Sequence, residues 1–591
     1  MLSGRKFVAA AAILACPLLL FARVVPLPVS LLAAELFLTI LGLFFFGSFK
    51  YQVHKNALTY GMALVMIATF CGLETSDWHR QIADTGAWSW ARQHLFSFQG
   101  LDELIHADTM LFILGLTFFV AVIAQTRMLE GITFVLLRHN RGAILPTAIA
   151  VTAVVAFASG ILDGVSMIGL TIRTLVIILM LAAAPKEAIL QAVMICTTVT
   201  TICGIWLAYG EPPNLIMKAN LDPHLGGTFF LRYCGPVAIV TYLVVARHLR
   251  KQLAGRHIDL DAMDVLDANA EDVRFLQASR HGEVLTPVEL VEAHQQHLNG
   301  KAPDIVRRLE GGTSLGRALV DAGVPWETRE VLLGHYVTEE LAPSLDRHYT
   351  LDALGDDEGA MLAEQWVDDT LAASAHARGR AQLIGGVALI PFVALLVVHG
   401  IYHQVPLFLA SFAGFGVALL GIANIPKMRA LALREGRHEY AEYYFLFPLF
   451  LSITLLTQAG FFDRMESLIH QGVQTLGHAP VAWGQFVGAT MLSAILDNNI
   501  VADFASRALG NLDLQVLHLF AMAQIAGYAL GGCWTHIGSA QSVVAYSFIQ
   551  RDVDAAFTPI QWITRMTPII LEMLVLITIV IYIESRLLNL N

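Results

Sequence analysis

Charged residues are scarce in this chain. Asp, Glu, Lys and Arg make up 14% of its 591 residues, against roughly 25% in an average soluble domain. Hydrophobic residues make up 56%, and the mean hydropathy is +0.61. This shortage of charge argues against an ordinary soluble domain and against a nucleic-acid partner.

Cysteines are also few. The six cysteines stand in or beside apolar segments, and their spacing contains no metal-binding pair. We therefore expect them to pack as small core residues, and we expect neither a resident metal nor a cofactor. The six are Cys16, Cys71, Cys196, Cys203, Cys234 and Cys533.

Long apolar runs are what the sequence has in abundance. Stretches close to the length of about 18 residues that crosses the hydrocarbon core recur along the chain. Two examples are "VSLLAAELFLTILGLFFFGS" and "TPIILEMLVLITIVIYI". The composition predicts an all-α polytopic membrane protein, surrounded by lipid in a bacterial inner membrane.

One region interrupts the apolar pattern. Residues 251–380 contain no run of membrane length, and they carry 24 Asp and Glu against 12 Lys and Arg. The whole chain has a formal charge of −11, so this region, at −12, leaves +1 for the rest. We therefore divide the chain into a first membrane half (1–250), an acidic helical insert (251–380) and a second membrane half (381–591).

The distribution of Lys and Arg predicts the orientation, because short cytoplasmic loops are enriched in these residues. With Arg5 and Lys6 inside, alternate loops hold most of the basic residues. The opposite loops hold only Arg23, Arg80, Arg92, Lys218 and Arg464. The amino terminus and the insert are therefore expected in the cytoplasm and the carboxyl terminus outside, with the two halves oppositely oriented.

A polar motif occurs twice. "SGILDGVSMIGLTIR" begins at Ser159, and "SAILDNNIVADFASR" begins 334 residues later at Ser493. A charged side chain at a helix centre costs roughly 2.5–3.5 kcal/mol on insertion, so a repeated Asp and Arg indicates a function. The motif pairs Asp163 with Asp497 and Arg173 with Arg507.

A second polar break follows each motif. "GIWLAYGEPPNLIM" and "GCWTHIGSAQSVVA" share Gly, Trp and Gly at matching positions. Gly, Asn-Asn and Pro-Pro all interrupt helices, and irregular backbone persists in hydrocarbon only where protein buries it or water lines it. We therefore predict two inverted-topology repeats, each with a re-entrant hairpin and a broken transmembrane helix, around one site near the midplane.

These motifs resemble those of the NhaD-type sodium/proton antiporters, in the ion-transporter superfamily that also contains arsenite, citrate and dicarboxylate carriers. The resemblance covers both membrane halves and rests on S-x-x-x-D, S-x-x-x-D-N, G-x-P-P-N and I-G-S-x-x-S. Gly164 stands where the first motif usually has asparagine, and Glu211 stands where G-T-P-P-N has a hydroxyl residue. The resemblance implies a homodimer that exchanges Na⁺ or Li⁺ for H⁺.

It also implies that the motif aspartates and the neighbouring Ser and Asn side chains bind the cation. The implied ligands are Ser159, Asp163, Asn214, Ser493, Asp497, Asn498, Ser539 and Ser542. Carboxylate, hydroxyl and amide oxygens make a hard site, suited to Na⁺ or Li⁺. Desolvation disfavours an ionised carboxyl group, so protons compete with the metal ion and exchange follows from that competition.

The remaining charged residues have two interpretations each. The aspartates could pair with the motif arginines. Ten residues span about 15 Å of helix, too far for a pair within one half, so a pair between the two halves is the structural alternative. We expect Arg173 and Arg507 to brace the hairpins. Glu130 and Glu211 are candidates for a proton relay; the alternative places them in water at a cavity mouth.

Two other functions stay open. A sodium-coupled citrate or dicarboxylate carrier would place S-N-T at the breaks; no S-N-T occurs here, and the aspartates would repel an anion unless sodium neutralised them. An intramembrane aspartyl protease needs a close carboxyl dyad, and its membrane families carry G-x-G-D, which is absent. We expect a transporter and no enzyme.

Overall fold

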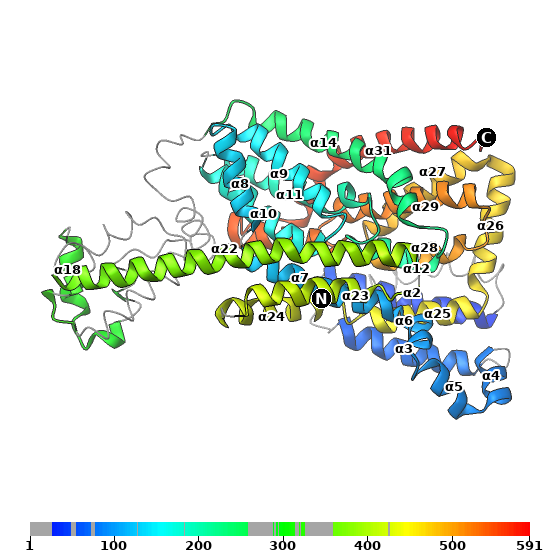
Figure 1. The fold of residues 1–591 in the computed structure, drawn as a ribbon. Coiled ribbons are helices and arrows are strands. Elements are labelled where there is room, and N and C mark those ends of the chain that lie inside the picture. The colour runs from blue at the N-terminus through cyan, green and yellow to red at the C-terminus, as the bar shows by residue number, and fades with distance from the viewer. Residues whose placement is uncertain are drawn as a thin grey trace, which may run out of the picture.

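The protein is built from helices. The computed structural model describes residues 27–48, 55–72, 77–126, 128–162, 164–181, 184–257, 295–311, 358–402, 404–423, 426–441 and 443–590, with isolated short stretches between 288 and 324. Within these ranges there is no β-strand, and Ala143 and His257 form an isolated bridge. The prediction of an all-α polytopic membrane fold is confirmed, and the fold is consistent with a transporter (Figure 1).

Seven stretches of the described helices are long and apolar enough to cross a membrane. They are Ala107–Gln125, Lys186–Gly204, Gly227–Leu253, Gly379–Ile401, Met428–Gln458, Leu514–Trp534 and Pro559–Leu587. Shorter apolar helices lie between them, including Ile144–Ala158 and Phe408–Gly421. The protein is therefore a multi-pass membrane protein.

The chain forms one series of helices around each motif. The chain first forms α2 (Leu27–Ser48), α3 (Lys55–Cys71), α4 (Asp77–Thr85), α5 (Ala87–His94) and α6 (Phe98–Ile105). The first half then contains α7 (Ala107–Gln125), α8 (Met128–His139), α9 (Ile144–Ala158), α10 (Gly164–Leu181), α11 (Lys186–Thr200), α12 (Pro212–Asn220) and α14 (Gly235–Leu253). The second half contains α25 (Leu446–Gln458), α26 (Phe461–Leu476), α27 (His478–Ser493), α28 (Asn498–Ser506), α29 (Leu514–Trp534), α30 (Ala540–Phe548) and α31 (Pro559–Leu587). Their opposite orientation in the membrane stays a prediction.

Local sequence explains where the broken helices restart. Pro212 and Pro213 occupy the first turn of α12, where a missing backbone N–H removes no helical hydrogen bond. Ser539 caps α30, since its side chain accepts the backbone N–H of Ser542. Each short restarted helix packs on the hairpin of the other half: α12 contacts α28, and α30 contacts α10. The polar breaks of the two halves are therefore interleaved.

Three further helices connect the halves. α23 (Phe408–Gly421) and α24 (Pro426–Ala441) pack on α7, and Asp108 of α7 caps α23 by accepting the backbone N–H groups of Leu407 and Phe408 at 2.9 and 3.0 Å. α22 (Glu358–Ile401) has 44 residues, and so a length of about 66 Å. It runs along the bundle and on towards α18 (Ala302–Glu310), beyond the other helices (Figure 1). One continuous helix thus crosses the boundary that the sequence placed at residue 380.

Two expectations from the sequence are wrong. Lys218 does not lie in a loop: it belongs to α12, is buried, and its Nζ lies 3.0 Å from His399 Nε2. Cys71, at the end of α3, is exposed. Of the other cysteines, Cys16 lies outside the described residues, and the remaining four are buried as expected: Cys196, Cys203, Cys234 and Cys533.

Candidate functional site

The tip of the second hairpin is built around Asp497. Its backbone is non-helical (φ −58°, ψ 136°), and it is the N-cap of α28. Its Oδ1 accepts the backbone N–H of Asn499 at 2.9 Å and the Asn499 side-chain amide at 2.8 Å. The carboxylate therefore starts the short helix, because an N-cap side chain satisfies a backbone donor that the first turn leaves free.

The two asparagines after Asp497 point to a polar site. Asn498 and Asn499 are both buried, and the Oδ1 atom of Asn499 has no hydrogen-bond partner in the described part of the chain. A buried oxygen without a partner is costly unless water or a ligand satisfies it. The sequence had singled out Asn498 alone, although both asparagines follow the aspartate directly.

The two motif serines occupy matching environments. Ser493 Oγ donates to the carbonyl oxygen of Tyr528 on α29 at 2.8 Å. Ser159 Oγ lies 3.5 Å from the carbonyl oxygen of Val199 on α11, and 3.2 Å from that of Ala156 in its own helix. Both side chains are fully buried. A hydroxyl that donates its hydrogen keeps its lone pairs for another contact. Each serine is therefore a neutral oxygen that remains able to accept from a donor or coordinate a cation.

Polar residues of the two broken helices meet across the halves. Tyr528 Oη donates to Asn214 Oδ1 at 2.6 Å, and the Asn214 amide donates to the carbonyl oxygen of Leu207 at 3.3 Å. Gln541 Nε2 lies 2.8 and 3.0 Å from the two carboxylate oxygens of Glu211. The first-half segment G-E-P-P-N is thus held by side chains that come from α29 and α30.

The hydroxyls of the second break point inward as well. Ser539 and Ser542 are buried; Ser539 Oγ donates to Ser542 Oγ at 3.2 Å, and Ser542 Oγ donates to the carbonyl oxygen of Gly532 at 2.7 Å. These hydroxyls order the backbone of the break and add further oxygens close to it.

Of the two candidate relay residues and the charged residues of the first hairpin, the structure describes only the Glu211 side chain. Glu211 is 2% exposed, so the alternative that it faces water at a cavity mouth is wrong. Glu130 lies in the first turn of α8 and Arg173 in α10, and their side chains are outside the described set. Asp163 itself lies outside the described residues, between Leu162 and Gly164.

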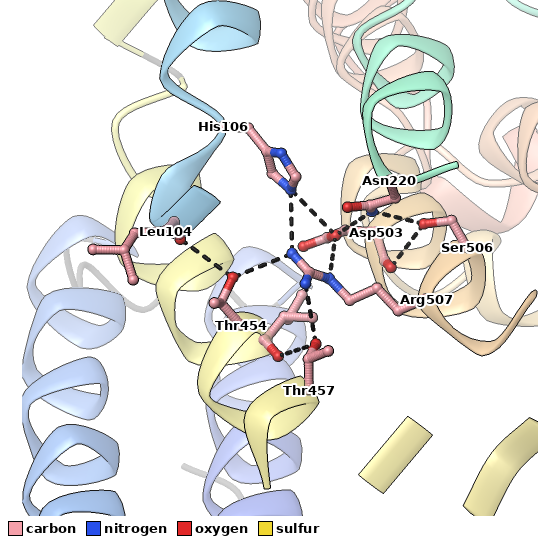
Figure 2. A network of polar contacts seen from close by, with 9 residues as sticks. Leu104, His106, Asn220, Thr454, Thr457, Asp503, Ser506 and Arg507 are labelled. Carbon is pink, nitrogen blue, oxygen red and sulfur yellow. Dashed lines mark hydrogen bonds and ion pairs between the residues drawn. The ribbon is translucent and has the colours of Figure 1, made fainter. Parts of the chain in front are cut away.

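Arg507 forms the centre of a second polar network (Figure 2). Its Nε donates to Asp503 Oδ1 at 2.9 Å, and its two terminal nitrogens lie 3.0 to 3.2 Å from Thr457 Oγ1, Thr454 Oγ1 and His106 Nε2. Asp503 is fully buried. Because α28 has nine residues, with Asp497 before it and Arg507 after it, the motif aspartate and arginine lie at opposite ends of this helix.

The same network reaches into the first half. The Asn220 amide, at the end of α12, donates to Asp503 Oδ1 at 2.7 Å and to Ser506 Oγ at 2.8 Å. His106 lies between α6 and α7 with φ 53°, and its Nε2 is 3.7 Å from Asp503 Oδ1. The far end of the second hairpin is thereby tied to α12, α25 and the start of α7 (Figure 2).

The structure brings Asn214 and Glu211 into contact with residues of the second half, and it separates Asp497 from Arg507. Tyr528, Gln541, Asp503 and His106 were missed in the sequence, although Asp503 stands four residues before Arg507, a spacing that places two side chains on one helix face. Within the described residues, no group of three or more His, Cys, Asp and Glu side chains could hold a metal ion. Among the described residues, the breaks offer carboxylate, hydroxyl, amide and carbonyl oxygens.

Comparison with known proteins yields a likeness to a solved structure. No family model matches the chain, and no curated protein matches it. Among solved structures, the fold is similar to that of the Alcanivorax borkumensis YdaH transporter, with a TM-score of 0.40 and 14% sequence identity. The match covers 82% of this chain and 89% of that one.

Proposed function

We propose that this protein is a secondary transporter that exchanges Na⁺ or Li⁺ for H⁺ across the bacterial inner membrane by alternating access. One observation supports the proposal above the others. Polar side chains of the first break contact the second half: Glu211 contacts Gln541 of the second break, and Asn214 contacts Tyr528, which lies inside α29. Broken helices that meet in this way are typical of the substrate and ion sites of secondary transporters.

The chemistry of the second hairpin tip supports a small hard cation. The Asp497 carboxylate accepts the backbone and side-chain N–H groups of Asn499, whose own buried Oδ1 is unsatisfied, and Ser493, with its buried Oγ, stands four residues earlier at the end of α27. Oxygen ligands with one formal charge suit an alkali cation. A half-buried carboxylate that binds either a proton or the cation, but not both at once, couples their movements in opposite directions.

The sequence supplies a second candidate acid, Asp163. It occupies the position equivalent to Asp497 in the first motif. Two such acids would exchange more than one proton per cation, and transport would then carry net charge. We further propose that the protein works as a homodimer embedded in lipid, with its amino terminus and insert in the cytoplasm and its carboxyl terminus outside.

Everted membrane vesicles that contain the protein provide the test. After respiration has established a pH gradient, addition of NaCl or LiCl should dissipate it, whereas choline chloride should not. The same vesicles should not respond to citrate or succinate at constant cation concentration. A response to the organic anions without one to the alkali cations would replace the antiporter with an anion carrier.

A further inference from the structure

Three residues, two from the first half and one from the second, pack against one another. Gly164 begins α10, Glu211 precedes α12, and Gln541 lies in the first turn of α30. A Cβ atom added at Gly164 would overlap Glu211 Oε1, and it would lie 2.8 Å from Gln541 Nε2 and 3.1 Å from Glu211 Cδ. The backbone approaches as closely as the side chains, since Gly164 N donates to the carbonyl oxygen of Gly210 at 2.9 Å.

This contact links the two positions at which the motifs depart from the pattern that they resemble. Position 164 has glycine where asparagine is usual, and position 211 has glutamate where a hydroxyl residue is usual. The Glu211 carboxylate occupies the space into which a side chain at position 164 would extend. Asparagine at 164 would therefore displace the ends of the Glu211 and Gln541 side chains, which couples the residue at position 164 to the residue at position 211.

We propose that Glu211 is a third exchangeable acid of the cation site, its carboxylate standing in for the side chain that position 164 lacks. This inference rests on the proposed function. When the cation enters, the protonated carboxyl group of Glu211 releases its proton to water and the resulting carboxylate contributes its charge to the site. Gln541 is the positioning residue, because its amide nitrogen contacts both carboxylate oxygens.

The surroundings of Glu211 fit an acid that changes its protonation state. It is 2% exposed, so its charge is poorly solvated. Titratable groups on the elements packed around it include Tyr528 and Cys533 of α29, Asp497 and Asp503 of α28, Lys218 of α12, Arg173 of α10 and Asp108 of α7. The matching position in the second half is Ser539, reached by the same offset of 328 residues that relates Gly210 to Gly538. The extra acid therefore belongs to one half alone.

Proton counting on the purified full-length protein tests the assignment. Calorimetric titrations with NaCl or LiCl, in two buffers of different ionisation enthalpy and with choline chloride as the ionic control, give the protons released per bound cation. Glu211→Gln should release about one proton fewer than the wild type. Glu187→Gln, a matched change at an exposed surface ion pair with Arg565, should release the same number as the wild type. An unchanged proton count in Glu211→Gln overturns the proposal.

A second comparison covers the case in which Glu211→Gln does not fold. Gly164→Asn alone should lower the yield of folded protein several-fold, and Gly164→Asn with Glu211→Thr should recover most of it. Failure of the double variant to exceed the single one shows that the two positions do not exchange side chains. The outcomes also separate this inference from the antiport itself. If proton release depends on Glu211 but the vesicles show no exchange, the proposed cation/proton exchange is wrong and the role of Glu211 stands. If exchange is intact but the proton count of Glu211→Gln is unchanged, the proposed role of Glu211 is wrong and the exchange stands.

Discussion

Gly538 lies so close to Ser493 that a Cβ atom at this glycine would be 2.6 Å from the serine carbonyl oxygen. Real Cβ atoms do not approach an oxygen so closely, so only glycine fits. The first half repeats the contact, because a Cβ at Gly210 would overlap the carbonyl oxygen of Ser159. In both halves, then, the glycine of the helix break lies directly against the end of the first helix of the hairpin, α9 or α27, and the motif serine is the residue that it touches.

This close approach predicts the effect of adding one methyl group. Gly538→Ala should lower the thermal midpoint of the purified protein, because backbone must move on one side of the contact; overpacking of this kind costs about 1–3 kcal/mol. Gly484→Ala is the matched control in the same half, since it lies in α27 with no atom within 4 Å of its Cβ position. The control should match or exceed wild-type stability, because alanine favours a helix. Equal midpoints for the two variants would contradict the contact.

The Arg507 network predicts a second difference between like substitutions. Arg507→Lys keeps the charge but loses the planar fork that contacts Asp503, Thr457, Thr454 and His106 together. We expect it to lower the free energy of unfolding by about 2–4 kcal/mol, since hydrogen bonds to charged groups are worth about 1.5–3 kcal/mol each. Arg565→Lys, in a surface pair with Glu187, should cost less than about 1 kcal/mol.

Transport then separates bracing from ion binding at Arg507. Exchange per folded molecule, measured in liposomes at matched protein density, should stay near the wild-type rate in Arg507→Lys. A variant that folds normally and no longer exchanges would place Arg507 on the ion path.

Tyr528 and Tyr242 make hydrogen bonds of the same length in different places. Tyr528 Oη joins the halves through Asn214, and Tyr242 Oη donates to the carbonyl oxygen of Ile149 within the first half, both at 2.6 Å. Each Tyr→Phe change should destabilise the protein by about 0.5–1.5 kcal/mol, because one side-chain hydrogen bond is lost. Tyr528→Phe should in addition change the exchange rate per folded molecule, whereas Tyr242→Phe should not. Identical rates would show that the contact between halves does not govern transport.

The sequence predicted the breaks but not their partners, and the physics explains the difference. Gly, Pro and Asn act on their own backbone, so G-E-P-P-N, L-D-N-N and I-G-S could be recognised where they stand. Tyr528 and Gln541 touch residues more than 300 positions away. Gln541 stands inside the recognised break G-S-A-Q-S, but local sequence does not show which distant residue it contacts, and Tyr528 lies in an apolar helix. Asp503 was within reach of local reasoning, since it precedes Arg507 by one helical turn.

Burial was equally hard to foresee for single charged residues. Glu211 stands directly before Pro212 and Pro213, and Lys218 follows the same proline-rich segment. Such sequence is typical of exposed loops, yet both residues are buried because the short helix α12 packs against the opposite hairpin. A charge count assigned to loops therefore fails where a helix is broken inside the protein. Transporters bind their ions at such breaks. The residues whose burial the charge count mispredicts therefore lie at the proposed site.

The last prediction concerns Asp497, where the structure makes an isosteric change unusually informative. Asn and Asp are equally good N-caps, so Asp497→Asn should keep the start of α28, including the bond from the Asn499 backbone N–H. It removes the titratable charge alone. Coupled exchange should fall below a tenth of the wild-type rate at every pH, and Asp163→Asn should do the same, each with normal folded yield. Asp513→Asn, at the exposed N-cap of α29, is the matched control and should exchange normally.

Ser493→Ala keeps the charge but removes a neutral oxygen, so it should raise the apparent sodium constant while leaving the maximal rate. The measurement is exchange per folded molecule in liposomes as a function of pH and sodium concentration. If the Asp163→Asn and Asp497→Asn double variant exchanges Na⁺ for H⁺ at near-normal rate, the motif aspartates are structural and the ions bind elsewhere.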